Sequence, residues 1–178
     1  FYTKYKFLNR DDVHKHFRMA TFGRVSLNNA DIHQQEINLF GHNSGYELGV
    51  NATQLLHKLA ISGGVSYIQA INNGNKNNFP KTEANQGTYY TLSFGRLMLP
   101  KVYKDYKQTN VNLMCEFLGQ TLFKNQLSYL DVAPSVQFII KSKMRLDLAY
   151  RYELYSNMQR TAPNGFLIRF EYNFFNVY

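Results

Sequence analysis

Several features that mark common protein classes are missing from this sequence of 178 residues. A single cysteine, Cys115, excludes an internal disulfide framework and a cysteine-based metal site. No stretch approaches the roughly 20 consecutive apolar residues that a transmembrane helix needs. No helical repeat of apolar residues persists beyond a turn or two. A helical membrane protein is therefore excluded, and the fold has to be sought among strands.

Motifs of the common enzyme classes are also missing. The sequence has no G-x-S-x-G, no usual histidine or cysteine metal spacing and no glycine-rich phosphate loop. His14 and His16 share one side of a strand and could contact a metal, but a solvated strand end is the simpler interpretation. His42 and Ser44 flank a turn without a carboxylate nearby in sequence. We therefore predict no catalytic residue, no metal and no cofactor.

Tyrosine and phenylalanine, in contrast, are abundant. There are fourteen of each, and aromatic residues make up 16% of the chain against 18% charged residues. Aromatic residues fit pleated surfaces, and period-two alternation recurs throughout the chain. The mean hydropathy of −0.40 does not exclude a membrane barrel, because alternating strands keep the average low. The sequence predicts an all-β fold in one domain, residues 1–178.

Turn signals separate eight alternating segments, which we expect to form antiparallel strands. They lie at about 16–27, 45–56, 59–70, 88–99, 110–122, 129–141, 144–156 and 165–178. Residues 31–40, preceded by a tight turn at Asn28 and Asn29, are a weaker candidate, and so are residues 3–8. The prediction is an up-and-down antiparallel sheet of eight to ten strands.

Residue parity divides these strands between two faces of different chemistry. One face is almost uniformly apolar, and toward the C-terminus it presents Phe138, Tyr150, Tyr152, Phe166, Ile168, Phe170, Tyr172 and Phe174. The other face holds the charged residues Arg18, Arg24, Glu47, Glu116, Asp131, Lys141, Arg145, Asp147, Arg151, Glu153, Arg169 and Glu171. Basic and acidic groups are equal in number on this face, so the net charge of +8 falls on loops, turns, termini and Arg96.

The class of protein depends on whether the apolar face contacts lipid or packs inside a soluble barrel. An eight-stranded barrel has an interior only just wide enough for side chains, and this many large residues would overpack it. The apolar stripe of the last strand spans about 28 Å when tilted, close to the apolar band of an outer-membrane barrel. Short connections at 56–59 and 141–143 alternate with long ones at 72–87 and 157–165. These features favour a transmembrane β-barrel over a soluble lipocalin-like binder of a small ligand, which stays the main alternative.

The final strand carries a resemblance to a known class. The segment "FEYNFF" resembles the C-terminal assembly signal of bacterial outer-membrane β-barrels, although the chain continues with "NVY". The segments "LDVAPSVQFI", "RLDLAYRYEL" and "GFLIRFEYNFF" are similar to poorly characterised outer-membrane proteins of the Bacteroidota. This resemblance covers roughly the last 130 residues. It implies a location in the bacterial outer membrane and passage through the barrel-assembly machinery, and says little about activity.

The charged face allows two interpretations. Interleaved opposite charges can pair across strands and fill a narrow lumen, which gives a structural polar core. The same charges could line a narrow conduit if Gly49, Gly64 and Gly95 leave space. A third hypothesis, an outer-membrane enzyme, would bring Asp, Ser and His together near 31–45 and 72–87.

The expected partners follow from the membrane location. Lys101, Lys104 and Lys107 alternate with Tyr103 and Tyr106, a spacing in which a nucleic-acid site is conceivable. At the rim of a membrane barrel these residues would meet lipid phosphates or a periplasmic protein, and an ordinary solvated turn is simpler still. We expect outer-membrane lipid and other outer-membrane or periplasmic subunits as partners, and no nucleic acid.

Overall fold

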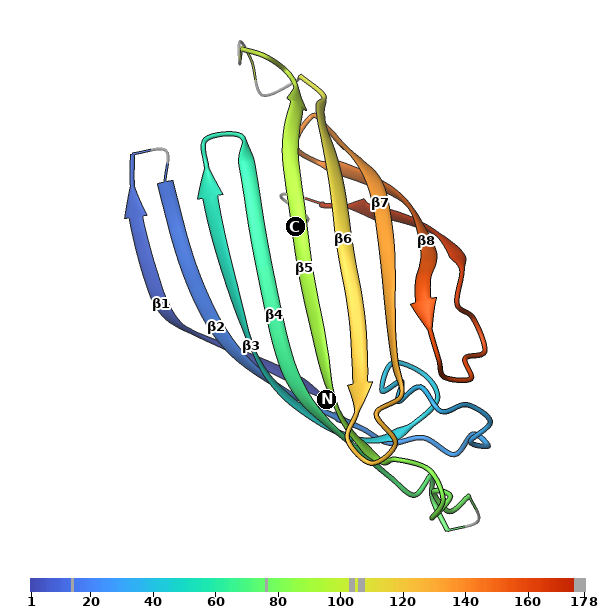
Figure 1. Ribbon diagram of the computed structural model, residues 1–178. Helices are drawn as coiled ribbons and strands as arrows, with labels where there is room; N and C mark the ends of the chain where they lie inside the picture. The colour runs from blue at the N-terminus through green and yellow to red at the C-terminus, as the bar shows by residue number, and fades with distance from the viewer. Residues whose placement is uncertain (14, 76, 103–104, 106–107, 175–178) are drawn as a thin grey trace.

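The computed structural model describes residues 1–13, 15–75, 77–102, 105 and 108–174, and these form one nine-stranded antiparallel sheet (Figure 1). Its strands pair in chain order and are β1 (Tyr2–Asp12), β2 (Lys15–Ser26), β3 (Ser44–Leu56), β4 (Leu59–Ile71), β5 (Gln86–Leu99), β6 (Asn110–Leu122), β7 (Ser128–Ile140), β8 (Met144–Ser156) and β9 (Gly165–Tyr172). The all-β up-and-down prediction is confirmed. Within the described residues there is no helical segment with the length and hydropathy that a membrane span requires.

The strand predictions hold with small changes at the ends. All eight strongly alternating segments are strands, and the weak candidate at 3–8 is the centre of β1. The last strand is shorter than expected, because β9 ends at Tyr172. Residues 175–178, including the predicted end of that strand, lie outside the described residues.

Residues 31–40 do not form a strand, so the prediction there was wrong, as was the tight turn at Asn28 and Asn29. The segment belongs to the long β2–β3 connection, residues 27–43, which is irregular in structure. Its alternating Ile37 and Leu39 imitate a strand pattern, but both side chains are buried in the core. Main-chain groups of this connection form hydrogen bonds with side chains, in place of the bonds that a neighbouring strand would provide.

The connections give the sheet two unlike rims. At the short-turn rim, His57 and Lys58 join β3 to β4, and residues 141–143 join β7 to β8. At the long-loop rim lie the connections 27–43, 72–85 and 157–164, with a shorter one at 123–127. The medium-length connection 100–109 at the short-turn rim departs from this division.

The sheet curls into a trough that is not closed. Figure 1 shows β1 to β8 side by side, with the red strand of residues 165–172 passing back behind β6 and β7. Among the described residues β1 pairs with β2 alone and β9 with β8 alone, so both edges are unpaired. This arrangement is consistent with a barrel, and we call the gap between the two unpaired edges the seam.

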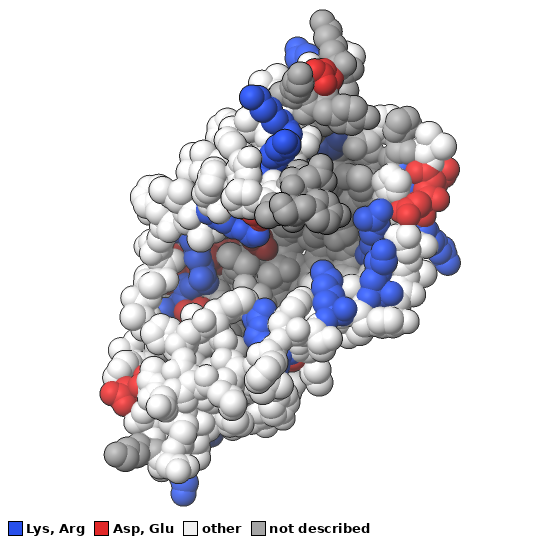
Figure 2. Space-filling view, turned by 180° about the vertical axis from the view of Figure 1, so that it is seen from behind, with Lys and Arg blue, Asp and Glu red and all other residues white. Residues whose placement is uncertain are grey.

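Two faces result from this curvature. Seen from behind, Figure 2 shows a hollow in which basic and acidic side chains gather. The residues of this concave face include Glu47 and Asp131, which are both buried. The convex face carries exposed large apolar side chains such as Leu48, Leu92 and Leu148.

A small apolar core fills the concave face next to the long-loop rim. It combines side chains from the three long loops with side chains from β4, β6 and β7, namely Ile37, Leu39, Ala84, Met158, Ile68, Ala70, Leu122 and Tyr129. The loops therefore fold into the trough and cover one end of it. The sequence predicted only a polar interior, and the apolar packing of the loops was not foreseen.

Candidate functional site

The β2–β3 connection is tied to the floor of the trough by one glutamine. Gln120 on β6 is buried, and its side chain accepts a hydrogen bond from Ile37 N at 3.0 Å and donates one to Ile37 O at 2.9 Å. Asn73 holds the other end of the connection by accepting from Ser44 N at 2.6 Å and donating to His42 O at 2.6 Å. The loop is thus fixed by side chains whose polar groups have no access to water.

The β8–β9 connection lies against the same loop and inserts an arginine into the trough. Gln35 N donates to Gln159 O at 3.0 Å, and Gln159 N donates to Gln35 Oε1 at 2.8 Å. This reciprocal pair places Arg160 over the concave face, where its side chain is 1% exposed. A buried guanidinium is stable only with paired and hydrogen-bonded neighbours.

Arg160 forms hydrogen bonds with three carboxylates. Its Nη1 and Nη2 donate to Asp131 at 2.8 and 2.7 Å, a bidentate geometry, and its Nε donates to Glu36 at 3.0 Å. Nη1 also donates to Glu153 at 3.0 Å. Burial lowers the pKa of Arg160, but its hydrogen bonds to Asp131 and the nearby charge of Glu36 outweigh burial and raise this pKa above its ordinary value. The arginine stays charged.

A second arginine completes the group. Arg151 Nε donates to Asp131 Oδ2 at 2.6 Å, and Nη2 lies 3.7 Å from Glu36. The guanidinium of Arg160 stacks over the Tyr129 ring at 3.7 Å from its centroid. We call Arg151, Arg160, Asp131, Glu36 and Glu153 the Arg160 cluster. With all five charged it carries one excess negative charge and joins both loops to β7 and β8.

A separate ion pair lies across the trough. Arg24 on β2 donates to Glu47 on β3 at 3.0 Å, and Ser66 on β4 donates to the other oxygen of Glu47 at 2.6 Å. Arg24 also stacks over the ring of Phe40, which comes from the β2–β3 connection, at 3.8 Å from the centroid. The loop is thus anchored to charged groups on both walls of the trough.

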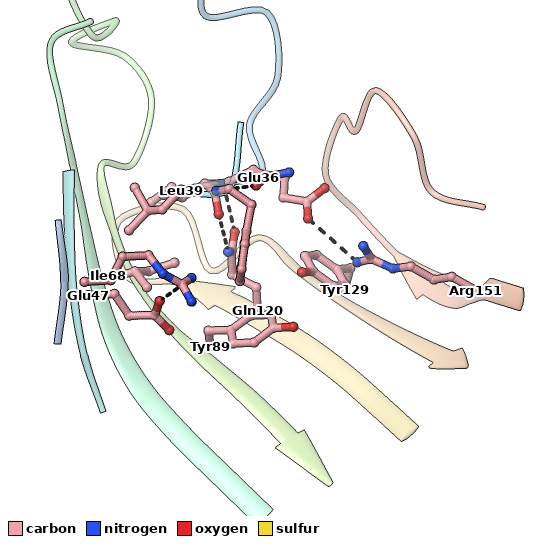
Figure 3. A pocket seen from close by; sticks show the side chains of 12 residues that line it. Glu36, Leu39, Glu47, Ile68, Tyr89, Gln120, Tyr129 and Arg151 are labelled. Carbon is pink, nitrogen blue, oxygen red and sulfur yellow. Dashed lines mark hydrogen bonds and ion pairs between the residues drawn. The ribbon is translucent and has the colours of Figure 1, made fainter. Parts of the chain in front are cut away.

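A cavity of about 100 Å³ remains between these anchors (Figure 3). Figure 3 shows Glu36, Tyr129 and Arg151 on one side of it and Glu47 on the other. Known binding sites for drug-sized ligands are several times larger. The space is of a size for a few waters or a very small polar molecule.

The other predicted charged residues pair locally. Arg145 with Asp147 (2.9 Å) and Arg169 with Glu171 (2.9 Å) form ion pairs along their own strands. The register also sets Arg145 opposite Glu171 and Asp147 opposite Arg169, so opposite charges face each other across β8 and β9. Arg18 lies 3.5 Å from Asp11, a residue of β1 that the sequence did not bring into the network. Glu116 is half-buried on β6, and the ion pairs among the described residues do not include it. Lys141 lies in the β7–β8 turn and not on a strand face.

The inward glycines leave less space than a conduit was expected to need. A Cβ on Gly49 would meet the Phe22 ring at 2.6 Å, and one on Gly64 would collide with the side chain of Asn51. Only Gly95 has ordinary contacts, the nearest being Met114 at 3.5 Å. Neighbouring side chains therefore fill two of the three expected gaps.

The predicted lipid-facing residues lie on the convex side. Phe166, Ile168, Phe170, Phe174, Tyr150, Tyr152 and Tyr172 are exposed, with Phe166 at 84%, and Phe138 is half-buried. On the edge strand β9 the charged Arg169 is exposed as well and its partner Glu171 is half-buried, since no strand covers that edge. The separation of apolar from charged side chains is therefore clearer on the strands between the two edges than on β9.

Two members of the cluster could not be found from the sequence. Glu36 and Arg160 lie in loops 124 positions apart, and no local pattern links them. The one available signal is the alternation of residues 31–40, which predicts a strand. Of the basic connection 100–110, Tyr103, Lys104, Tyr106 and Lys107 lie outside the described residues, and so does His14.

The third hypothesis expects Asp, Ser and His to meet near 31–45 and 72–87, and the hydrogen bonds described there for Ser44 are with Asn28 and Asn73. Ser44 Oγ accepts from Asn28 N at 2.7 Å and donates to Asn28 O at 3.1 Å. From the second loop, the side-chain oxygen of Asn73 accepts a hydrogen bond from Ser44 N. Within the described ranges, no group of three or more His, Cys, Asp or Glu side chains could hold a metal ion.

Comparison with known proteins gives no family for the chain. No protein-family model, no curated protein and no solved structure matches it.

Proposed function

We propose that the protein is an integral β-barrel of the bacterial outer membrane that serves as a structural or accessory subunit, with an interior closed near the long-loop rim. The observation that carries this proposal is that the two faces of the sheet differ in chemistry. Its convex face is apolar and exposed, and its concave face holds paired charges. In water such a convex face would be an unusually large apolar patch. In lipid it is the favourable surface, and the strand ladder satisfies the backbone.

The proposed location and partners rest on a sequence resemblance. The C-terminal aromatic alternation resembles an outer-membrane assembly signal, and three segments are similar to outer-membrane proteins of the Bacteroidota. The partners of this proposal are outer-membrane lipid, other outer-membrane or periplasmic subunits and, during biogenesis, the barrel-assembly machinery. The Arg160 cluster serves to seal the trough and to fix the loops as a rigid outer surface. We assign it no catalytic role.

Membrane extraction tests the location. Protein produced with a secretory leader in a Gram-negative host is expected to stay with the membrane through alkaline and urea washes and to require detergent. The folded protein is expected to migrate faster than the boiled protein on a mild detergent gel. A monomer that remains in solution without detergent would overturn the proposal in favour of the soluble lipocalin-like binder.

A narrow conduit is the second candidate, and one observation favours it. Toward the short-turn rim a pocket of about 390 Å³ is lined by small and polar residues such as Gly95, Asn112 and Gln137, together with the apolar Leu55, Leu97 and Met114. Conductance in planar bilayers separates the two functions. A sealed subunit gives no channel activity, and Arg151→Ala leaves it silent. A conduit conducts, and the same substitution changes its conductance.

A further inference from the structure

We infer that the open seam between β1 and β9 is an interaction surface for one further β-strand, which runs antiparallel to both edges and turns carboxylates toward the trough. This inference rests on the proposed membrane location, because unpaired edges are costly in lipid and must be covered there. Two observations support it: the direction of the two edge strands and the charges beside the seam.

Direction limits what can cover the seam. Tyr2 pairs with Arg24 beside the long-loop rim, so β1 runs from that rim to the short-turn rim. Tyr172 pairs with Met144 beside the short-turn rim, so β9 runs in the same direction. Direct closure of β9 on β1 would therefore be parallel in a sheet that is otherwise antiparallel. Parallel pairing is slightly less stable, and bacterial outer-membrane barrels have even strand numbers.

The same reasoning disfavours a second copy of the chain. Two copies inserted in the membrane with the same orientation present edges that all run in one direction. Their β1 and β9 could pair only in parallel. One strand that runs from the short-turn rim to the long-loop rim is the smallest addition with which both edges can pair antiparallel.

Charge specifies the inward face of that strand. Lys4 pairs with Phe22 and Lys6 with Ala20, and cross-strand partners share a face, so both lysines belong to the concave side. Among the ion pairs of the described residues, neither lysine has a partner. On the other edge Arg169 is already paired with Glu171. The seam is thus positive on its β1 side, and an acidic inward face complements it.

The outward face of the strand is specified by its neighbours. Tyr5 on β1 and Ile168 and Phe170 on β9 are exposed beside the seam on the convex side. The strand that fits therefore alternates apolar residues with acidic ones over about ten residues, the length of a membrane-spanning strand.

A synthetic strand tests this inference. The purified protein in detergent is titrated with a fluorescent peptide of about ten residues that alternates leucine or tyrosine with glutamate. A matched peptide carries lysine in place of glutamate. We expect the acidic peptide to bind about tenfold more tightly, from two favourable cross-strand pairs in place of two repulsive ones. The double variant Lys4→Glu/Lys6→Glu is expected to reverse the preference.

Three results would overturn the inference. The first is the absence of peptide binding, and the second is equal binding of the two peptides. The third comes from cysteines placed at Tyr5 and at positions of β9 in Cys115→Ser protein, if they form disulfides without peptide. The last result means that the edges close on each other. A concentration-dependent dimer that excludes the peptide would assign the seam to a second copy. Failure of the proposed function shows separately, as protein that needs no detergent.

Discussion

Removal of the Arg160 guanidinium should be the most damaging single change in the trough. Arg160→Met keeps the stem but deletes the hydrogen bonds to Asp131, Glu36 and Glu153. Asp131, which is fully buried, then keeps Arg151 as its one cationic partner, and Glu36 keeps Arg151 at 3.7 Å. Breaking a buried pair from one side costs about 3–5 kcal/mol. Such a loss lowers the folding equilibrium constant by about two to four powers of ten.

Arg169→Met is the matched control for this change. Arg169 makes an ion pair of the same type with Glu171 at 2.9 Å, but its side chain is 55% exposed. Exposed pairs contribute about 0–1 kcal/mol. Urea unfolding of both variants in the same detergent or lipid gives the two free energies of unfolding.

Equal losses in the two variants would refute the reasoning, since they would show that burial adds nothing to the Arg160 pairs. If Arg160→Met fails to fold, Arg160→Lys keeps the charge without the bidentate fork and should lose less. A double-mutant cycle with Asp131→Asn is expected to give a coupling energy of about 0.5–3 kcal/mol, as for residues in one network. A coupling energy of zero would contradict the direct pair.

Three further changes probe the faces, the packing and the loop anchor. Leu148→Arg on the middle of the convex face should cost about 2–4 kcal/mol of unfolding free energy in lipid, and Leu154→Arg, nearer the rim on the same face, about 0–1; equal costs would contradict the membrane orientation. Gly49→Val should lower stability by about 1–3 kcal/mol in urea unfolding because Phe22 and Ser66 fill the space, whereas Gly41→Ala, with nothing within 4 Å, should leave the packing undisturbed. Gln120→Leu removes both hydrogen bonds to Ile37, and limited proteolysis should then cleave residues 27–43 faster than in the parent protein; an unchanged rate would show that Gln120 does not hold the loop.

The sheet could be predicted from the sequence because strand parity is a local signal. Apolar and charged residues alternate along β8 from Met144 to Leu154, with Ala149 as the exception, and the short turns at His57 and at residues 141–143 limit the possible registers. Parity also placed Asp131, Arg151 and Glu153 on one face. Each of these inferences needs only residues that are near in sequence.

The loops could not be predicted for the opposite reason. Glu36 meets Arg160 across 124 positions, and the order of the loops in space depends on the curvature of the whole sheet. Ile37 and Leu39 alternate as a strand would, although they pack downward into the trough. An alternating pattern indicates which side chains are buried, but it does not indicate which groups form hydrogen bonds with the backbone.

The side of the sheet that faces hydrocarbon is the central claim, and a nitroxide scan of β8 tests it most directly. Single cysteines at each position from Leu146 to Glu153, in a Cys115→Ser background, are spin-labelled in lipid vesicles. Collision with oxygen, which concentrates in lipid, should peak at Leu146, Leu148, Tyr150 and Tyr152 and fall at the odd-numbered positions between them. High collision rates with a water-soluble nickel reagent at the even-numbered positions would contradict the claim.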